Sequence, residues 1–337
     1  MSRDAPDAGA ARMSRFANLT VVRFLVGGSA VAITYIGLAP LLLQVGFQLL
    51  APLLLHHFGE GDKAIQSGSV DLNSAPHTMA CLGIMRALVY LVTALAVFAV
   101  YKVYVRVMEK RTLTEFSRRG AAADVRKGCL ATLLFVAVFL IPLILHGNLV
   151  IGGMNDWRYV PPLVCGAAMS AVCEEIFFRG LLFRLTESSL GSVIAVLLSS
   201  LLFGAAHYLN PHATLMRAIG LGLEAGLGLS ALYMLTRTLW LCITMHFTWN
   251  LITGLLSLPV SRTTSVGLFR SSLRGNELLT GGEFGVEASA LVIGAGIVVG
   301  VYLLIVAYKR HCYIRPYWAR QNKAPGEVLN EHRLMID

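Results

Sequence analysis

Two adjacent glutamates stand in the middle of an apolar stretch, in the segment AVCEEIFFRG at residues 171–180. A bare charge in hydrocarbon is costly, so each carboxylate needs a partner or a task. Glu175 and Arg179 are four residues apart and share one helix face, so they can form an ion pair. Glu174 lies about 100° further around the axis. We therefore expect a structural Glu175–Arg179 pair and a Glu174 side chain that faces a cavity.

Two later apolar segments carry polar groups at the same helical spacing. LLFGAAHYLN places Phe203 and His207 four residues apart, and LCITMHFTWN does the same for His246 and Asn250. Taken singly, such a histidine or asparagine can be a packing residue that bonds to a neighbouring helix. Together with Glu174 they occupy three of four consecutive apolar segments, and buried polar groups of this kind normally face a wet cavity or each other.

If these groups converge, their chemistry is defined. A carboxylate beside a neutral imidazole can hold a water molecule and take its proton, which is general-base catalysis. A second imidazole and an amide NH₂ can donate hydrogen bonds to an oxyanion that grows on a carbonyl. A base combined with oxyanion donors is what peptide-bond hydrolysis requires. No serine or cysteine is evidently paired with either histidine, so water is the expected nucleophile.

The composition places these groups in a membrane protein. Of the 337 residues, 56% are hydrophobic and only 14% are charged, and the mean hydropathy is +0.67. Soluble domains carry about a quarter charged residues. The net charge of +9 does not indicate nucleic-acid binding, because the basic residues gather between the apolar segments. The six cysteines show no CxxC spacing and are interpreted as small buried hydrophobes.

The uncharged windows predict an all-α fold, a polytopic membrane helical bundle with about eight transmembrane helices and a catalytic cavity inside the bundle. The expected spans cover residues 24–48, 79–104, 129–153, 160–184, 190–209, 213–235, 239–257 and 288–308. Membrane lipids are then unavoidable partners. The segment after the second span and the C-terminal tail are rich in lysine and arginine, which predicts that both termini face the cytoplasm.

The same windows divide the chain into five parts. They are a polar N-terminal tail (1–20), about three N-terminal transmembrane helices (21–157), a core that carries the polar candidate residues (158–257), an external loop with the last transmembrane helix (258–310) and a basic cytoplasmic tail (311–337). The loop 259–287 falls on the outer side, and its three arginines fit that placement least well.

Three motifs in this core resemble those of a known family. EExxxR at residues 174–179, FxxxH at 203–207 and HxxxN at 246–250 occur in this order, each on its own expected helix. In this pattern the chain resembles the CPBP family, the CAAX proteases and bacteriocin-processing enzymes, also described as lysostaphin-resistance-A-like. The similarity covers roughly residues 160–257. The later segment LTGGEFGVEAS also looks like a tail found in bacterial members, which points to a bacterial inner (cell) membrane.

The resemblance implies an intramembrane endopeptidase that acts on a membrane-associated protein or peptide. Glu174 and His207 would activate the water, His246 and Asn250 would stabilise the oxyanion, and the Glu175–Arg179 pair would order the site. The sequence lacks HExxH, so we favour a glutamic mechanism without a cofactor. A zinc site made by Glu174, His207 and His246 stays open as the alternative.

Two other classes of function can use the same residues. A non-proteolytic immunity protein or scaffold could retain the motifs, and a proton-coupled transporter could use buried Glu and His as a relay. Transporters often show two matching halves, whereas here the polar residues lie in the second half alone. Glu224, in GLGLEAGLGLS, belongs to none of the three motifs and its role stays open.

Overall fold

The structure is a computed structural model that describes residues 8–59, 76–210, 213–260 and 266–320. Helices make up most of this part of the chain, and six of them are long and apolar enough to cross a membrane. They cover Leu19–His57, His77–Val107, Ala121–Leu145, Trp157–Tyr208, Leu215–Thr236 and Ala290–Lys309. The predicted helical membrane bundle is confirmed, and the chain is an integral membrane protein.

The count of eight spans stays a prediction, for two structural reasons. The stretch Trp157–Tyr208 has 52 residues and contains two of the expected spans, which meet at Gly191 with the non-helical angles φ 84° and ψ 168°. A Cβ there would lie 2.8 Å from the backbone nitrogen of Pro316, so only glycine fits. The expected span 239–257 forms α10 (Trp240–Leu255), whose 16 residues fall short of a full membrane span.

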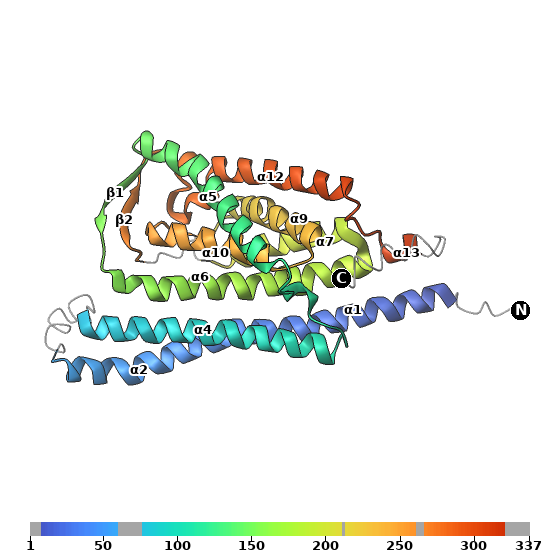
Figure 1. Cartoon of the computed structure of the whole chain (residues 1–337), viewed down its shortest axis with the longest axis horizontal. Coiled ribbons are helices and arrows are strands. Elements are labelled where there is room, and N and C mark those ends of the chain that lie inside the picture. Colours follow the sequence, from blue (N-terminus) through green and yellow to red (C-terminus); the bar gives the residue numbers. More distant parts are fainter. Residues whose placement is uncertain (1–7, 60–75, 211–212, 261–265, 321–337) are drawn as a thin grey trace, which may run out of the picture.

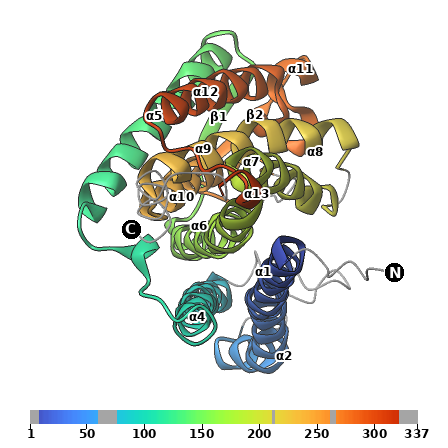
Figure 2. The same ribbon diagram turned by 90° about the vertical axis from the view of Figure 1, so that its right-hand side faces the viewer.

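The N-terminal helices form a group of their own at the edge of the bundle. α1 (Ala8–Ala32), the π-helical η1 (Ile33–Leu38) and α2 (Ala39–His57) run on as one long helix beside α4 (Pro76–Val107) (Figure 1). α1 thus begins inside the segment predicted as a polar tail. Figure 2 shows this group on one side of the molecule, with the remaining helices on the other. Large apolar side chains of α2 are exposed, as lipid contact requires.

The second group of helices surrounds the three motifs. It comprises α5 (Ala121–Leu145), α6 (Val160–Glu175), the π-helical η5 (Ile176–Phe183), α7 (Arg184–Tyr208), α8 (Leu215–Leu221), the π-helical η6 (Gly222–Gly226), α9 (Leu227–Thr236), α10 and α12 (Ala290–Lys309). α7 and α8 approach closely at Gly204, where a Cβ would lie 2.3 Å from the carbonyl oxygen of Ala218. Small residues permit such contacts between membrane helices.

Two short strands were not expected from the sequence. β1 (Leu149–Met154) pairs antiparallel with β2 (Phe269–Leu273), which lies in the predicted outer loop. The expected span 129–153 therefore ends as a helix at Leu145. His146 caps the helix and Gly147, with φ 71°, comes next; a glycine at positive φ in this position is a common way to end a helix.

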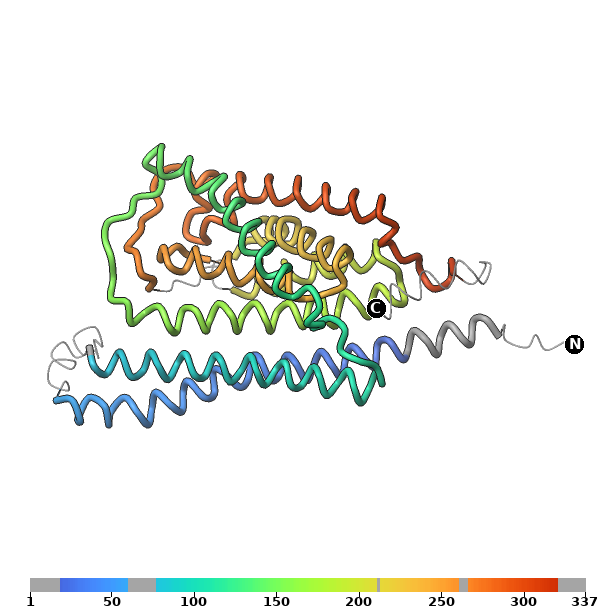
Figure 3. Tube along the Cα trace, viewed as in Figure 1, coloured from blue at the N-terminus to red at the C-terminus, as the bar shows by residue number. Residues whose placement is uncertain are grey.

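The two ends of the bundle differ in their contents (Figure 3). The strand pair lies at one end. The connection between α4 and α5 and the short α13 (Tyr317–Arg320) lie at the other. We call residues 108–120, which join α4 to α5, the linker.

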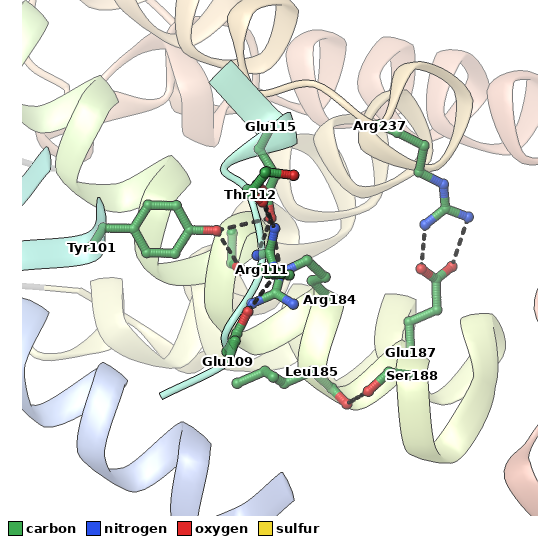
Figure 4. A network of polar contacts seen from close by, with 11 residues as sticks. Tyr101, Glu109, Arg111, Thr112, Glu115, Arg184, Leu185, Glu187, Ser188 and Arg237 are labelled. Atoms are coloured by element: carbon green, nitrogen blue, oxygen red, sulfur yellow. Dashed lines mark hydrogen bonds and ion pairs between the residues drawn. The ribbon is translucent and has the colours of Figure 1, made fainter. Parts of the chain in front are cut away.

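Ion pairs and hydrogen bonds hold the linker in place. We call the side chains that form them the linker network: Tyr101, Glu109, Arg111, Glu115 and Arg184. Figure 4 shows these side chains together with Arg237, which bonds to both carboxylate oxygens of Glu187 near the start of α7. Arg237 also donates to the carbonyl oxygen of Cys312, at 2.9 Å. Ion pairs and hydrogen bonds therefore hold the linker, α7 and the segment after α12 at one end of the molecule.

Candidate active site

All three motifs meet on the inner faces of α6, η5, α7 and α10. The carboxylate oxygen Oε2 of Glu174 lies 3.9 Å from Nε2 of His207 and 4.0 Å from Nε2 of His246. The three side chains thus lie close together, as we expected from their spacing in the sequence. We call the group formed by Tyr35, Ser170, Glu174, Glu175, Arg179, His207, His246 and Asn250 the central cluster.

The Glu175–Arg179 pair is fully buried and has a second task. Nη1 of Arg179 donates to Oε1 of Glu175 at 3.0 Å, and both side chains are inaccessible to solvent. The same Oε1 lies 2.9 Å from Nδ1 of His246. Nη2 of Arg179 donates to the carbonyl oxygens of Ala225 and Gly226 in η6. The pair therefore connects three helical segments and orients one imidazole, a contact the sequence did not indicate.

Phe203 packs among these charged groups. Its ring lies 4.6 Å from the ring of His207 and 4.9 Å from the guanidinium carbon of Arg179, measured from its centroid. An aromatic face attracts a cation at such a distance. The phenylalanine of the FxxxH motif thus contacts both the EExxxR motif and its own histidine. This explains in physical terms why an aromatic residue stands one turn before His207.

Asn250 is linked to Glu174 through the hydroxyl of Ser170. Its Nδ2 donates to Oγ of Ser170 at 3.4 Å, and that hydroxyl donates to Oε1 of Glu174 at 2.8 Å. Tyr35 of η1 also donates to Oε1, at 3.4 Å. Neither Ser170 nor Tyr35 was predicted as a site residue. Ser170 lies four residues before Glu174 and could have been found by helical spacing, whereas Tyr35 is 139 residues away.

The hydrogen-bond partners of the histidines determine which nitrogen carries a proton. Nδ1 of His207 lies 2.8 Å from the carbonyl oxygen of Phe203, which can only accept, so this nitrogen is the donor. Nδ1 of His246 likewise faces the carboxylate of Glu175. In the neutral rings, both Nε2 atoms are then acceptors. They face Oε2 of Glu174, another acceptor, for which the described residues supply no hydrogen-bond donor.

Three acceptors that face each other need a shared donor. A water molecule fits this arrangement, because two hydrogen bonds of about 2.8 Å that meet at one oxygen span about 4 Å or more. Such a water can donate to two of the acceptors, and Oε2 of Glu174 is common to both measured distances. The geometry thus suits a water molecule held between a carboxylate and an imidazole.

A zinc ion demands shorter separations than these. Zinc binds nitrogen and oxygen at about 2.0–2.2 Å with tetrahedral angles, which places neighbouring ligand atoms about 3.3–3.5 Å apart. The separations of 3.9 and 4.0 Å are wider. Within residues 8–59, 76–210, 213–260 and 266–320, no group of three or more His, Cys, Asp or Glu side chains is placed to hold a metal ion. As placed, Glu174, His207 and His246 do not fit zinc.

The central cluster borders a large cavity. Its volume is about 1370 Å³, and residues of α1, η1, α4, α5, α6, α7, α9, α10 and α12 line it, most of them apolar. Small-ligand pockets measure about 300–1,000 Å³, so this cavity offers room for a polypeptide segment. Glu224 of η6 also lines it, and Gly296 of α12 makes room for that side chain. The contacts of the central cluster do not include Glu224.

The helices can cross a membrane, and a partly buried Glu–His site lies beside a large cavity between them. These features define a helical integral membrane protein with a polar site inside its bundle. The family comparison adds the chemistry. Residues 156–252 match the family model of the type II CAAX prenyl endopeptidase Rce1-like proteins. All three motifs lie inside the matched segment, so the resemblance to the CPBP family is confirmed and supports a CAAX-type intramembrane endopeptidase. No curated protein and no solved structure matched the chain.

Proposed function

We propose that this protein hydrolyses a peptide bond of a membrane-associated protein or peptide within the bundle. The observation that carries the proposal is the position of Oε2 of Glu174, which faces both imidazoles and has no hydrogen-bond donor from the described residues. A buried carboxylate oxygen left in this state is what a general base requires, because it can accept the proton of a bound water.

The proposed reaction follows from the donors and acceptors around that oxygen. Glu174 takes a proton from the water held beside His207, and the water oxygen attacks the carbonyl carbon of the substrate. In the reacting form, His246 carries a second proton on Nε2, and the carboxylate of Glu175 balances the charge. That Nε2 then donates to the oxyanion instead of accepting as it does in the neutral ring, and Asn250 supplies an amide hydrogen. The proton on Glu174 then passes to the leaving nitrogen as the C–N bond breaks. No metal takes part in these steps.

Replacing Glu174 by Gln tests this proposal, because the amide keeps the shape of the side chain and cannot take the proton. We expect cleavage to fall about 10²–10⁴-fold, since a general base contributes that much. Substrates identified by trapping with the variant in native membranes, and cleaved by the wild type, provide the assay. Glu224→Gln is the matched control, a carboxylate in the same cavity. Near-normal turnover by Glu174→Gln would contradict the assignment.

Metal removal separates the glutamic mechanism from the zinc alternative. A catalytic zinc lowers the pKa of its water to about 7, so its loss abolishes activity. We expect activity to survive exhaustive chelation and the purified protein to hold no stoichiometric metal. Activity that is lost on chelation and restored by zinc, with about one zinc ion per chain, would instead assign Glu174, His207 and His246 as metal ligands.

We also propose a bacterial inner membrane with both termini in the cytoplasm. The basic linker and the start of the basic tail lie at the same end of the bundle (Figure 3), and cytoplasmic loops carry the excess of Lys and Arg. A reporter fused to the C-terminus that is active in the cytoplasm alone supports this orientation. Activity of a reporter that requires the outer side would reverse it.

A further inference from the structure

The two oxygens of Glu174 have different surroundings. Oε2 faces the imidazoles, whereas Oε1 accepts one hydrogen bond from Ser170 at 2.8 Å and one from Tyr35 at 3.4 Å. The terminal torsion of a glutamate side chain is broad, so an unrestrained carboxylate rotates easily. Two donors on one oxygen hold the carboxylate plane and keep the other oxygen directed at the histidines.

Tyr35 comes from a part of the chain that the family match does not include. The match begins at residue 156, whereas Tyr35 lies in the π-helical η1. π-helical segments inside α-helices occur frequently at functional sites. Two more are present in the described residues that surround the site, η5 with Arg179 and η6 with the two carbonyl groups that Arg179 binds. Tyr35 thus shares its local π-helical geometry with Arg179 of the central cluster.

The position of Tyr35 is fixed by packing of α1 against the core. Phe24 forms an edge-to-face contact with Phe177 of η5, with ring centroids 6.0 Å apart. Val31 is 1% exposed and belongs to the buried core cluster. Phe24, Val31 and Tyr35 recur at the spacing of one helix face. The face that docks α1 onto the core therefore also brings the Tyr35 hydroxyl to Glu174.

Ser170 links the base to the amide of the site. Its hydroxyl gives its hydrogen to Glu174 and accepts one from Asn250 at 3.4 Å. A serine hydroxyl has one hydrogen and two lone pairs, so both contacts can exist at once. An orientation imposed on Glu174 is then coupled to that of Asn250.

We propose that Tyr35 is a positioning residue for Glu174, acting together with Ser170, so that the N-terminal helix completes the active site from outside the matched segment. This inference rests on the proposed function, since it presumes that Glu174 is the base. Tyr35 does not touch the substrate in this scheme. It acts by keeping Oε2 directed at the water.

The test compares kcat, KM and melting temperature for Tyr35→Phe, which removes the hydroxyl and keeps the ring. We expect kcat to fall about three- to tenfold, with KM and melting temperature unchanged, because hydrogen bonds to charged groups are among the stronger ones but this one is long. Tyr104→Phe is the matched control. That ring packs against Gly27 of α1 and lies outside the cavity lining, so its kcat should stay at the wild-type value.

Ser170 supplies an independent measurement on the same oxygen. Ser170→Ala should lower kcat about tenfold, and Ser170→Thr, which keeps the hydroxyl, should restore most of it. An unchanged kcat in Tyr35→Phe, with Glu174→Gln inactive, would overturn the role of Tyr35 and leave the proposed function intact. A loss that accompanies a lower melting temperature would show that Tyr35 only supports the fold. An active Glu174→Gln would instead remove the proposed function itself.

Discussion

The linker network and the central cluster both combine carboxylates with guanidiniums, and they are built differently. In the linker network, Glu115 accepts from Nη1 and Nη2 of Arg111 and from the hydroxyl of Tyr101, and it lies 3.1 Å from Nε of Arg184 (Figure 4). In the central cluster, Oε2 of Glu174 has no donor among the described residues. The first carboxylate is saturated with hydrogen bonds, and the second is half satisfied.

The number of hydrogen bonds that each carboxylate accepts distinguishes a group that stabilises the fold from a group that is free to bind another molecule. Buried polar groups are nearly always hydrogen-bonded, and a satisfied network makes a structure rigid. The linker network joins α4, the linker, η5 and α7. The single hydroxyl hydrogen of Tyr101 is shared between Glu115 and the carbonyl oxygen of Gly180, each 3.1 Å away. Arg184 contacts both glutamates of the network. A carboxylate oxygen without a donor contributes nothing comparable to the fold. In the proposed function, the water molecule that Glu174 activates supplies the missing donor.

The largest effect should come from making the same substitution, Glu to Gln, once in each region. Glu174→Gln should reduce activity about 10²–10⁴-fold and leave the melting temperature unchanged. Glu115→Gln should lower the free energy of unfolding by about 3–5 kcal/mol, because it breaks buried pairs, while the protein that stays folded keeps its kcat. Thermal unfolding in detergent and a cleavage assay on both variants check this. The comparison breaks down if both changes affect the same property.

Much of the central cluster was predictable from the sequence because each motif lies within one helical turn. The spacing of Glu175 and Arg179 predicts their pair, and His207 and His246 are conspicuous in apolar segments. The contact of Glu175 with His246 joins residues 71 positions apart. No local pattern predicts it, since it depends on how α6 packs against α10.

The helical class was predictable from composition, whereas the details of the backbone were not. Apolar runs predict helices because a membrane leaves few other ways to satisfy backbone groups. The strand β1 was missed because the run without charged residues continues past Leu145 to Ile151, and such a window does not register the glycine beyond the helix end. The linker network was also missed, because Tyr101 lies in an expected span and Arg184 at the end of another.

Glu175 combines the hydrogen bonding of both regions, because one of its carboxylate oxygens has partners and the other has none in the described part of the chain. Its replacement therefore tests the comparison further. It is saturated on Oε1 by Arg179 and His246, but its Oε2 has no donor among the described residues. Glu175→Ala leaves Arg179 as an unpaired buried charge, which should cost about 3–5 kcal/mol of stability. The melting temperature and the yield should fall, and activity should be lost as a consequence. A variant that is inactive but as stable as the wild type would place Glu175 among the catalytic residues.

The smallest effect concerns the pH dependence of the linker network. Burial alone would raise the pKa of the Glu109 carboxyl, but the guanidinium groups of Arg184 and Arg111 outweigh it and hold that pKa below its usual value of 4.5. A carboxyl with a lowered pKa in the folded state stabilises the fold fully above its unfolded pKa. That contribution is lost as the pH falls below about 4.5 through the lowered value.

Glu109→Gln should therefore lower the melting temperature at pH 7 and make little difference once the pH lies below the lowered pKa of Glu109. Melting curves of the wild type and the variant at closely spaced pH values measure this difference. Glu277→Gln is the control, since its carboxylate is 73% exposed and pairs with Arg217 only at the surface, where an ion pair contributes little. A gap between wild type and Glu109→Gln that stays constant down to the lowest pH would show that shape or packing, and not the charge of Glu109, stabilises the linker.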